Sequence, residues 1–212
     1  SPNNPGYVIR GVTSDDDDSR SQPRISVFQD GVSISRSRAS VVELFDLERV
    51  EVVKGPQGTL FGRGAEIGAV HVIRNKPTNV LSGELSVGYG SYNQKLASGY
   101  INTPFAEGKL ANRFAFSYNA RDGFIKNLSG GRLNGKSTIA LRNSTRYWLG
   151  DKTTADLVFD YQYDDYPGTS FKSKMYAPAG GDTDPNSAAD LEQGEGLYIK
   201  RHVGGAAFLL DH

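Results

Sequence analysis

The sequence predicts a mixed α+β part with short strands, followed by long antiparallel strands of the kind that build a transmembrane β-barrel wall. Two observations predict this fold class. A glycine-rich turn separates two alternating strands in residues 43–77, and from about residue 81 the strands lengthen to ten residues or more. No apolar run approaches the roughly 18 residues of a membrane helix. A mean hydropathy of -0.46 is usual for soluble proteins and equally compatible with a barrel, because half of each barrel strand faces a polar interior, so hydropathy does not decide between them.

Short strands and turns are expected throughout residues 1–79. Asp30 and Gly31 predict a hairpin, since both tolerate the positive φ angles of a tight turn. A brief helical piece is expected around residues 41–45. Valines then alternate with charged or polar residues in residues 50–54 and again in residues 70–74. This period of two predicts two strands of a half-buried sheet.

The segment between these two strands predicts a sharp turn. Its glycines permit backbone conformations that other residues resist, and its proline fixes one φ angle. The residues that define this predicted signature turn are Gly55, Pro56, Gly58, Gly62, Arg63 and Gly68.

The order of strand, turn and strand resembles the end of the plug domain of TonB-dependent outer-membrane receptors. In that family an LERVEV strand leads into a GPQGTLFGR turn and then an aliphatic strand that closes with Lys-Pro, as in residues 47–77 here. Residues 9–11 and 24–32 resemble the two preceding plug strands in the same order. Glu66-Ile67 departs from the family, which usually has a small, glycine-rich step at this point.

The resemblance implies two domains. Residues 1–79 would be the C-terminal part of the plug, and residues 80–212 would be the first strands, about six, of a 22-stranded barrel. The first residues carry neither the charged nor the apolar region of an export signal, and the sequence ends within a strand-like pattern. We therefore expect the chain to be an internal fragment of a longer protein.

The long strands predict one apolar and one polar face. In residues 153–164 aromatic and aliphatic side chains alternate with Asp156, Asp160, Gln162 and Asp164. Side chains predicted to face lipid are Leu85, Val87, Phe114, Phe116, Leu157, Phe159 and Tyr161.

Loops and aromatic residues add to this pattern. Residues 150–152 form a short turn, whereas residues 122–136 and 165–196 are long, polar and glycine-rich, as expected of periplasmic turns and extracellular loops respectively. Aromatic residues near strand ends, Tyr147, Trp148, Tyr163 and Tyr166, favour a membrane interface. A soluble sandwich would show the same alternation with the faces reversed, so periodicity alone leaves both architectures open.

Composition and motifs argue against several other functions. The 24 Lys and Arg residues balance 24 Asp and Glu, so no global basic surface indicates nucleic acid. The glycines of residues 62–68 lack the spacing and the following helix of a dinucleotide site. The aspartates of residues 15–18 lack the alternate spacing of a calcium loop, and the three histidines share no ligand spacing. We therefore expect no catalytic residues, no metal site and no cofactor.

The resemblance implies a receptor of the bacterial outer membrane that takes up a scarce, bulky solute. Its partners would be the TonB protein, the lipid of the outer membrane and the solute, which the sequence does not distinguish among siderophore-iron, cobalamin, haem and oligosaccharide. Arg10 and Arg49 match plug arginines that in the family pair with barrel glutamates. The alternative from another class is a soluble ligand- or carbohydrate-binding β-domain. A passive porin fits less well, because porins need no separate plug domain.

Overall fold

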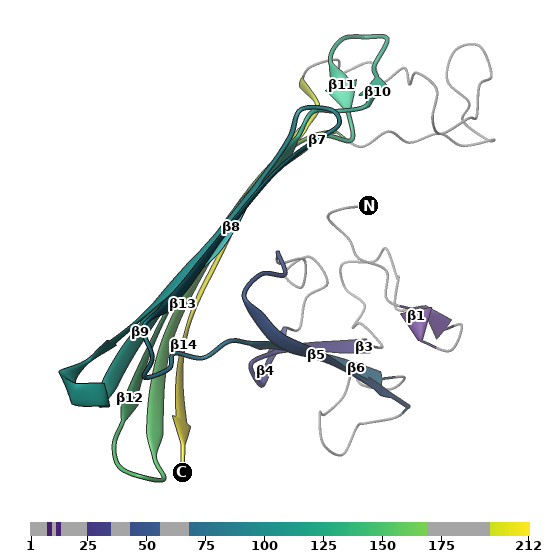
Figure 1. Cartoon of the computed structure of the whole chain (residues 1–212). Helices are drawn as coiled ribbons and strands as arrows, with labels where there is room; N and C mark the ends of the chain where they lie inside the picture. The colour runs from purple at the N-terminus through teal and green to yellow at the C-terminus, as the bar shows by residue number, and fades with distance from the viewer. Residues whose placement is uncertain (1–7, 10–11, 14–24, 35–42, 56–67, 169–195) are drawn as a thin grey trace. The chain divides into compact units, whose positions relative to one another are not determined.

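A computed structural model describes residues 8–9, 12–13, 25–34, 43–55, 68–168 and 196–212 (Figure 1). The chain divides into two compact units, Ser1–Lys76 and Pro77–His212, which we call the N-terminal and C-terminal units. In the described part of the chain no helix has the length and apolar character needed to cross a membrane.

The N-terminal unit contains a small hairpin and a four-stranded sheet. The hairpin pairs β1 (Val8–Ile9) with β2 (Val12–Thr13). The sheet has the order β4-β3-β6-β5, in which β3 and β6 are parallel and the other neighbours antiparallel. Its strands are β3 (Ile25–Gln29), β4 (Val32–Ile34), β5 (Leu47–Lys54) and β6 (Gly68–Arg74).

Apolar side chains from the two central strands form the core of this sheet. Ile25 and Val27 of β3 and Ala69 and Val72 of β6 are buried. Val50 lies opposite Val72, as the alternation predicts, yet Val50 is 46% exposed and Val72 only 6%. The difference arises because β5 is an edge strand of the sheet, so the predicted half-buried state holds for β6 alone.

The predicted hairpin at Asp30 and Gly31 is present. These residues join β3 to β4 with φ angles of 48° and 84°, the left-handed conformations that such a turn requires. The predicted helical piece is not seen where the structure describes it, because residues 43–45 have no regular secondary structure. Residues 41–42 lie outside the described residues.

The C-terminal unit is an antiparallel sheet of six long strands in the order β14-β13-β12-β9-β8-β7. Figure 1 shows these strands running side by side, with the small hairpin β10–β11 at one end. The strands are β7 (Ser82–Gly90), β8 (Gln94–Phe105), β9 (Leu110–Arg121), β12 (Lys136–Trp148), β13 (Thr154–Pro167) and β14 (Tyr198–Asp211). Their lengths suit a tilted crossing of a bilayer.

The two faces of the sheet differ as the alternation predicts. All seven side chains that we expect to face lipid lie on one face, here called the apolar face. On β13, Phe159 is 50% exposed while Val158, on the other face, is 3% exposed. That second face, here called the polar face, carries the buried charged and polar side chains Arg113, Ser117, Arg142, Ser144, Asp156, Gln162 and Asp164.

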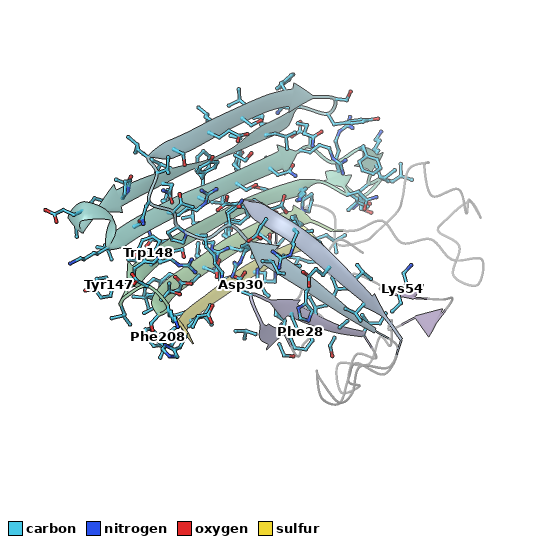
Figure 2. The ribbon with its side chains drawn as sticks, turned by 60° about the horizontal axis from the view of Figure 1, so that its bottom comes forward. Phe28, Asp30, Lys54, Tyr147, Trp148 and Phe208 are labelled. Carbon is cyan, nitrogen blue, oxygen red and sulfur yellow. The ribbon has the colours of Figure 1, made fainter. Side chains whose placement is uncertain are left out.

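The four aromatic residues lie near strand ends, as predicted, but on different faces of the sheet. Tyr147 and Tyr163 lie on the apolar face, but Trp148 and Tyr166 occupy polar-face positions. The reason is that neighbouring residues of a strand point to opposite faces, so Tyr147 and Trp148 cannot both face lipid. Both lie near the same end of the sheet (Figure 2).

The loop prediction also needs correction. Residues 122–135 contain an ordered hairpin of β10 (Ile125–Lys126) and β11 (Arg132–Leu133). Ile125 and Leu133 are buried against each other, and Leu197 packs on them. β13 continues to Pro167, so the predicted long loop begins later than residue 165; residues 169–195 lie outside the described part. Residues 91–93 join β7 to β8 at the same end of the sheet as the β10–β11 hairpin, and they form a short turn. The connections at this end are therefore not all long.

Candidate functional site

Only three of the predicted site residues lie where the structure can place them. Arg10, Pro56, Gly58, Gly62 and Arg63 fall outside the described residues. Gly55 directly follows β5 and has a φ angle of 108°, a conformation that favours glycine. Gly68 begins β6, where it is buried between Ile25 of β3 and Lys54 of β5. Gly55 and Gly68, the two described ends of the signature turn, therefore lie at adjacent ends of β5 and β6, where Lys54 pairs with Gly68.

Arg49 lies on the exposed edge strand β5. Its Nε donates to the Glu51 Oε1 at 2.7 Å, and Nη1 contacts the Glu48 carboxylate. The hydrogen bond with Glu51 raises the pKa of Arg49 above its ordinary value, with a further contribution from Glu48. Exposed pairs of this kind contribute little to stability because water and salt screen them. Pairing of Arg49 with a glutamate of the barrel wall, in place of Glu48 and Glu51, stays a prediction.

The buried ion pair between Asp30 and Arg74 was not predicted from the sequence. The Asp30 Oδ1 accepts from the Arg74 backbone N–H at 2.9 Å, and Oδ2 accepts from Nε at 2.8 Å. Both side chains are about nine-tenths buried, with 11% and 8% exposed. The Asp30 N–H also donates to the Val72 carbonyl oxygen at 3.0 Å. The β3–β4 turn is thus fastened to the end of β6 (Asp30 in Figure 2).

The polar face of the C-terminal unit carries a second unpredicted cluster, centred on Asp164. This carboxylate is completely buried. It accepts from Thr138 Oγ1 at 2.9 Å, from Gln162 Nε2 at 2.9 Å and from Tyr166 OH at 2.9 Å. Arg201 of the next strand donates from Nε at 2.7 Å. The network joins β12, β13 and β14 and gives a hydrogen-bond partner to Tyr166, which strand alternation places on the polar face.

Another cross-strand ion pair lies on the same face, nearer the short turn at residues 149–153. Arg146 and Asp156 are directly opposite, and two parallel N–H···O bonds of 2.6 Å join them. Arg113 of β9 stacks on the ring of Tyr100, with 3.6 Å between its Cζ atom and the ring centroid. Both arrangements satisfy guanidinium groups without placing charge on the apolar face.

The two faces of the C-terminal sheet suit a barrel wall that has lipid on one side and water on the other. One face presents aliphatic and aromatic side chains, and the other holds charge in paired networks. Within the described ranges no group of three or more His, Cys, Asp or Glu residues is arranged to hold a metal ion. Sequence alternation identified the two faces, but no signal identified the pairing of Asp30 with Arg74 across 44 residues.

Comparison with known families gives a match to the TonB-dependent Receptor Plug Domain over residues 1–69. Among curated proteins, the pesticin receptor of Yersinia enterocolitica is 28% identical over 119 residues, covering 56% of this chain. The metal-pseudopaline receptor CntO of Pseudomonas aeruginosa is 30% identical over 127 residues, covering 59% of this chain. Each alignment spans 17% of the relative's length.

Solved structures share the fold. The ferripyoverdine receptor of the outer membrane of Pseudomonas aeruginosa, bound to ferripyoverdine, aligns with a TM-score of 0.72 at 20% identity. That alignment covers 97% of this chain and 26% of the receptor. The ferric yersiniabactin uptake receptor FyuA of Yersinia pestis aligns with a TM-score of 0.69 at 23% identity, over 76% of this chain and 25% of that one. The fold is therefore a plug sheet together with strands of a larger antiparallel barrel.

Proposed function

We propose that this chain, which belongs to the TonB-dependent receptors of the bacterial outer membrane, serves in the uptake of a metal bound to a bulky organic chelator. The observation that carries the proposal is the succession of a plug domain and barrel strands within one chain. The relatives named for ferripyoverdine, ferric yersiniabactin and metal-pseudopaline favour a metal chelate over cobalamin, haem or an oligosaccharide.

Transport in this proposal requires energy to move the plug, and no covalent bond of the solute is formed or broken. The solute binds at the outer face, and the TonB protein, energised from the inner membrane, moves or partly unfolds the plug. The polar face of the wall then provides a surface that tolerates water and ions during passage. Arg10 and Arg49 hold the plug to the wall through glutamates until that movement begins.

A soluble ligand-binding domain receives no support from the C-terminal unit. A sandwich would cover its aromatic and aliphatic side chains with a second sheet. Here the described strands of the unit form one six-stranded layer and a small hairpin, and Val87 on the apolar face is 75% exposed.

The proposal is tested by uptake in cells. The receptor is expressed in a Gram-negative strain that lacks its own siderophore receptors, and the cells are given radioactive iron on a panel of siderophores, with haem and cobalamin as comparisons. We expect uptake of one or a few ferric chelates, abolished by loss of TonB or by a protonophore. Accumulation that continues without TonB would contradict the proposed mechanism, and uptake of haem or cobalamin alone would contradict the proposed solute.

A further inference from the structure

A short segment, residues 77–81, leads the chain from the N-terminal unit into β7. It belongs to the C-terminal unit, has no regular secondary structure, and is exposed over residues 78–81. The backbone groups of such a segment are usually bonded to water. The contacts that hold this segment therefore decide how firmly the end of the plug is tied to the barrel wall.

The side chain of Asn102 holds this segment on β8. Its Oδ1 atom accepts from the Thr78 N–H at 3.0 Å, and its Nδ2 atom donates to the carbonyl oxygens of Thr78 at 2.8 Å and of Val80 at 2.6 Å. Asn102 is completely buried on the polar face. Thr78 thus exchanges two hydrogen bonds with the amide group, as residues do in an antiparallel strand pair. We call these three hydrogen bonds the Asn102 clamp.

A second asparagine, Asn75, anchors the chain just before this segment, within the N-terminal unit. Its N–H donates to the Asp46 carbonyl oxygen at 3.0 Å, and its Nδ2 atom donates to Asp46 Oδ1 at 3.2 Å and to the Leu47 carbonyl oxygen at 3.1 Å. Lys76 and Pro77 are the residues between the two anchored stretches. Proline fixes its own φ angle and favours an extended conformation in the residue before it. The chain therefore has little slack between the two anchors.

Strand register places the Asn102 clamp where β7 begins. Ser82 is the first residue of β7, and its partner across the strand pair is Asn102 itself. In the described sheet β7 is a terminal strand, whereas β8 is paired on both sides, with β7 and with β9. Without the clamp, a pull on the preceding segment would act on the first hydrogen bonds of β7, which could then separate one after another. With the clamp, the same pull is carried to β8, which two strands hold.

We propose that Asn102 is the anchor at which movement of the plug ends, and that it carries the pull on the plug to β8 so that β7 stays paired. The inference rests on the proposed function, in which the TonB protein moves the plug. Asn102 touches no solute in this role and acts as a positioning residue. Because it keeps residues 78–80 on the wall, it also limits how far the end of the plug can travel.

Single-molecule force spectroscopy tests the clamp on the complete receptor inserted in a bilayer. An optical trap pulls on the N-terminal end, and the length of released chain is recorded. In the unchanged protein, release should end before residue 78. Asn102→Leu should also release residues 78–81, a further length of about 14 Å, and separation of the nine residues of β7 should then add about 30 Å. Because the trap supplies the load, the result does not depend on TonB or on a solute, so a failure of the proposed uptake would appear in the cell assay alone.

Two further variants separate the clamp from general effects of substitution. Asn102→Ala removes the same hydrogen bonds without adding bulk, so it should release the same length as Asn102→Leu. Asn119→Leu makes the same change on the polar face of β9, nearer the other end of the sheet, and should leave the released length unchanged. Release that ends before residue 78 in both Asn102 variants, or that lengthens equally in Asn119→Leu, would overturn the proposal.

Hydrogen exchange without load distinguishes an anchor from a residue that only stabilises the wall. In Asn102→Ala the amides of β7 should stay as protected as in the unchanged protein, because the backbone pairing of β7 with β8 is retained and the exposed segment can bond to water instead. The Thr78 amide should exchange faster, since it loses its acceptor. Loss of protection throughout β7 at rest would make Asn102 a structural residue of the wall and overturn its role as an anchor under load.

Discussion

The sheets of the two units use the same alternation of side chains with opposite results. In the N-terminal unit the apolar side chains of the central strands, Ile25 and Ala69, are fully buried. In the C-terminal unit Phe208 on the apolar face is exposed, whereas Asp164 on the polar face is completely buried. A period of two thus sets which residues share a face. The environment on each side of the sheet decides whether that face is apolar or polar, since lipid accepts exposed apolar groups and water does not.

Loss of Arg74 should produce the largest effect. Arg74→Leu leaves the buried Asp30 carboxylate without its cation, which should cost about 3 to 5 kcal/mol of the stability of the plug sheet. Hydrogen exchange of β3 and β6 amides in the inserted receptor measures this change. Lys54→Leu in the same sheet is the matched control, and because Lys54 is exposed it should leave those amides protected. Equal protection in both variants would show that burial of the Asp30–Arg74 pair is unimportant.

A charge on the apolar face should have the next largest effect. Phe159→Arg should cost about 2 to 4 kcal/mol if the residue lies near the bilayer midplane. Folding into lipid vesicles, measured as a function of urea, gives this value. Gly205→Arg, on the polar face directly opposite Asp160 and with open space around an added side chain, should cost much less. If both variants inserted equally well, the assignment of the faces to lipid and lumen would be wrong.

A polar cluster on the apolar face provides a smaller test. Asn112 and Asn143 form a reciprocal amide pair with hydrogen bonds of 3.1 and 3.2 Å, and Asn112 also donates to Thr145 Oγ1 at 2.8 Å. Asn112→Leu should destabilise the inserted wall by about 1 kcal/mol, because Asn143 loses its partner in hydrocarbon. The double variant with Asn143→Leu should recover that loss. Urea-dependent folding is again the measurement, and additive losses would contradict the pairing.

Arg49→Ala should have the smallest effect on stability, since its partners in β5 are exposed. Its expected consequence is functional: a looser plug and greater entry of large antibiotics, with the barrel still inserted. Antibiotic sensitivity of whole cells is the readout. Wild-type sensitivity together with unchanged plug mobility would remove Arg49 from the candidate site.

Several features followed from the sequence because they depend on neighbours along the chain. Alternation predicted the faces of the six long strands, and Asp30-Gly31 predicted its hairpin, since both are local consequences of backbone geometry. The strand and turn motif of residues 47–77 was sufficient to suggest the family. The same alternation, applied strictly, would have placed Trp148 and Tyr166 on the polar face.

Other features required the tertiary structure because they join residues distant in sequence. Val50 is exposed because β5 is an edge strand, and its own pattern matches that of buried β6. Asp30 meets Arg74, and Asp164 meets Arg201, through the pairing of particular strands. A cavity lined by Lys95, Tyr118, Lys136 and Asp165 likewise combines four strands, and Arg132 of the β10–β11 hairpin adds to its lining. Alternation therefore determined the face of each side chain, while strand order and register decided its partners, because those depend on how distant segments align.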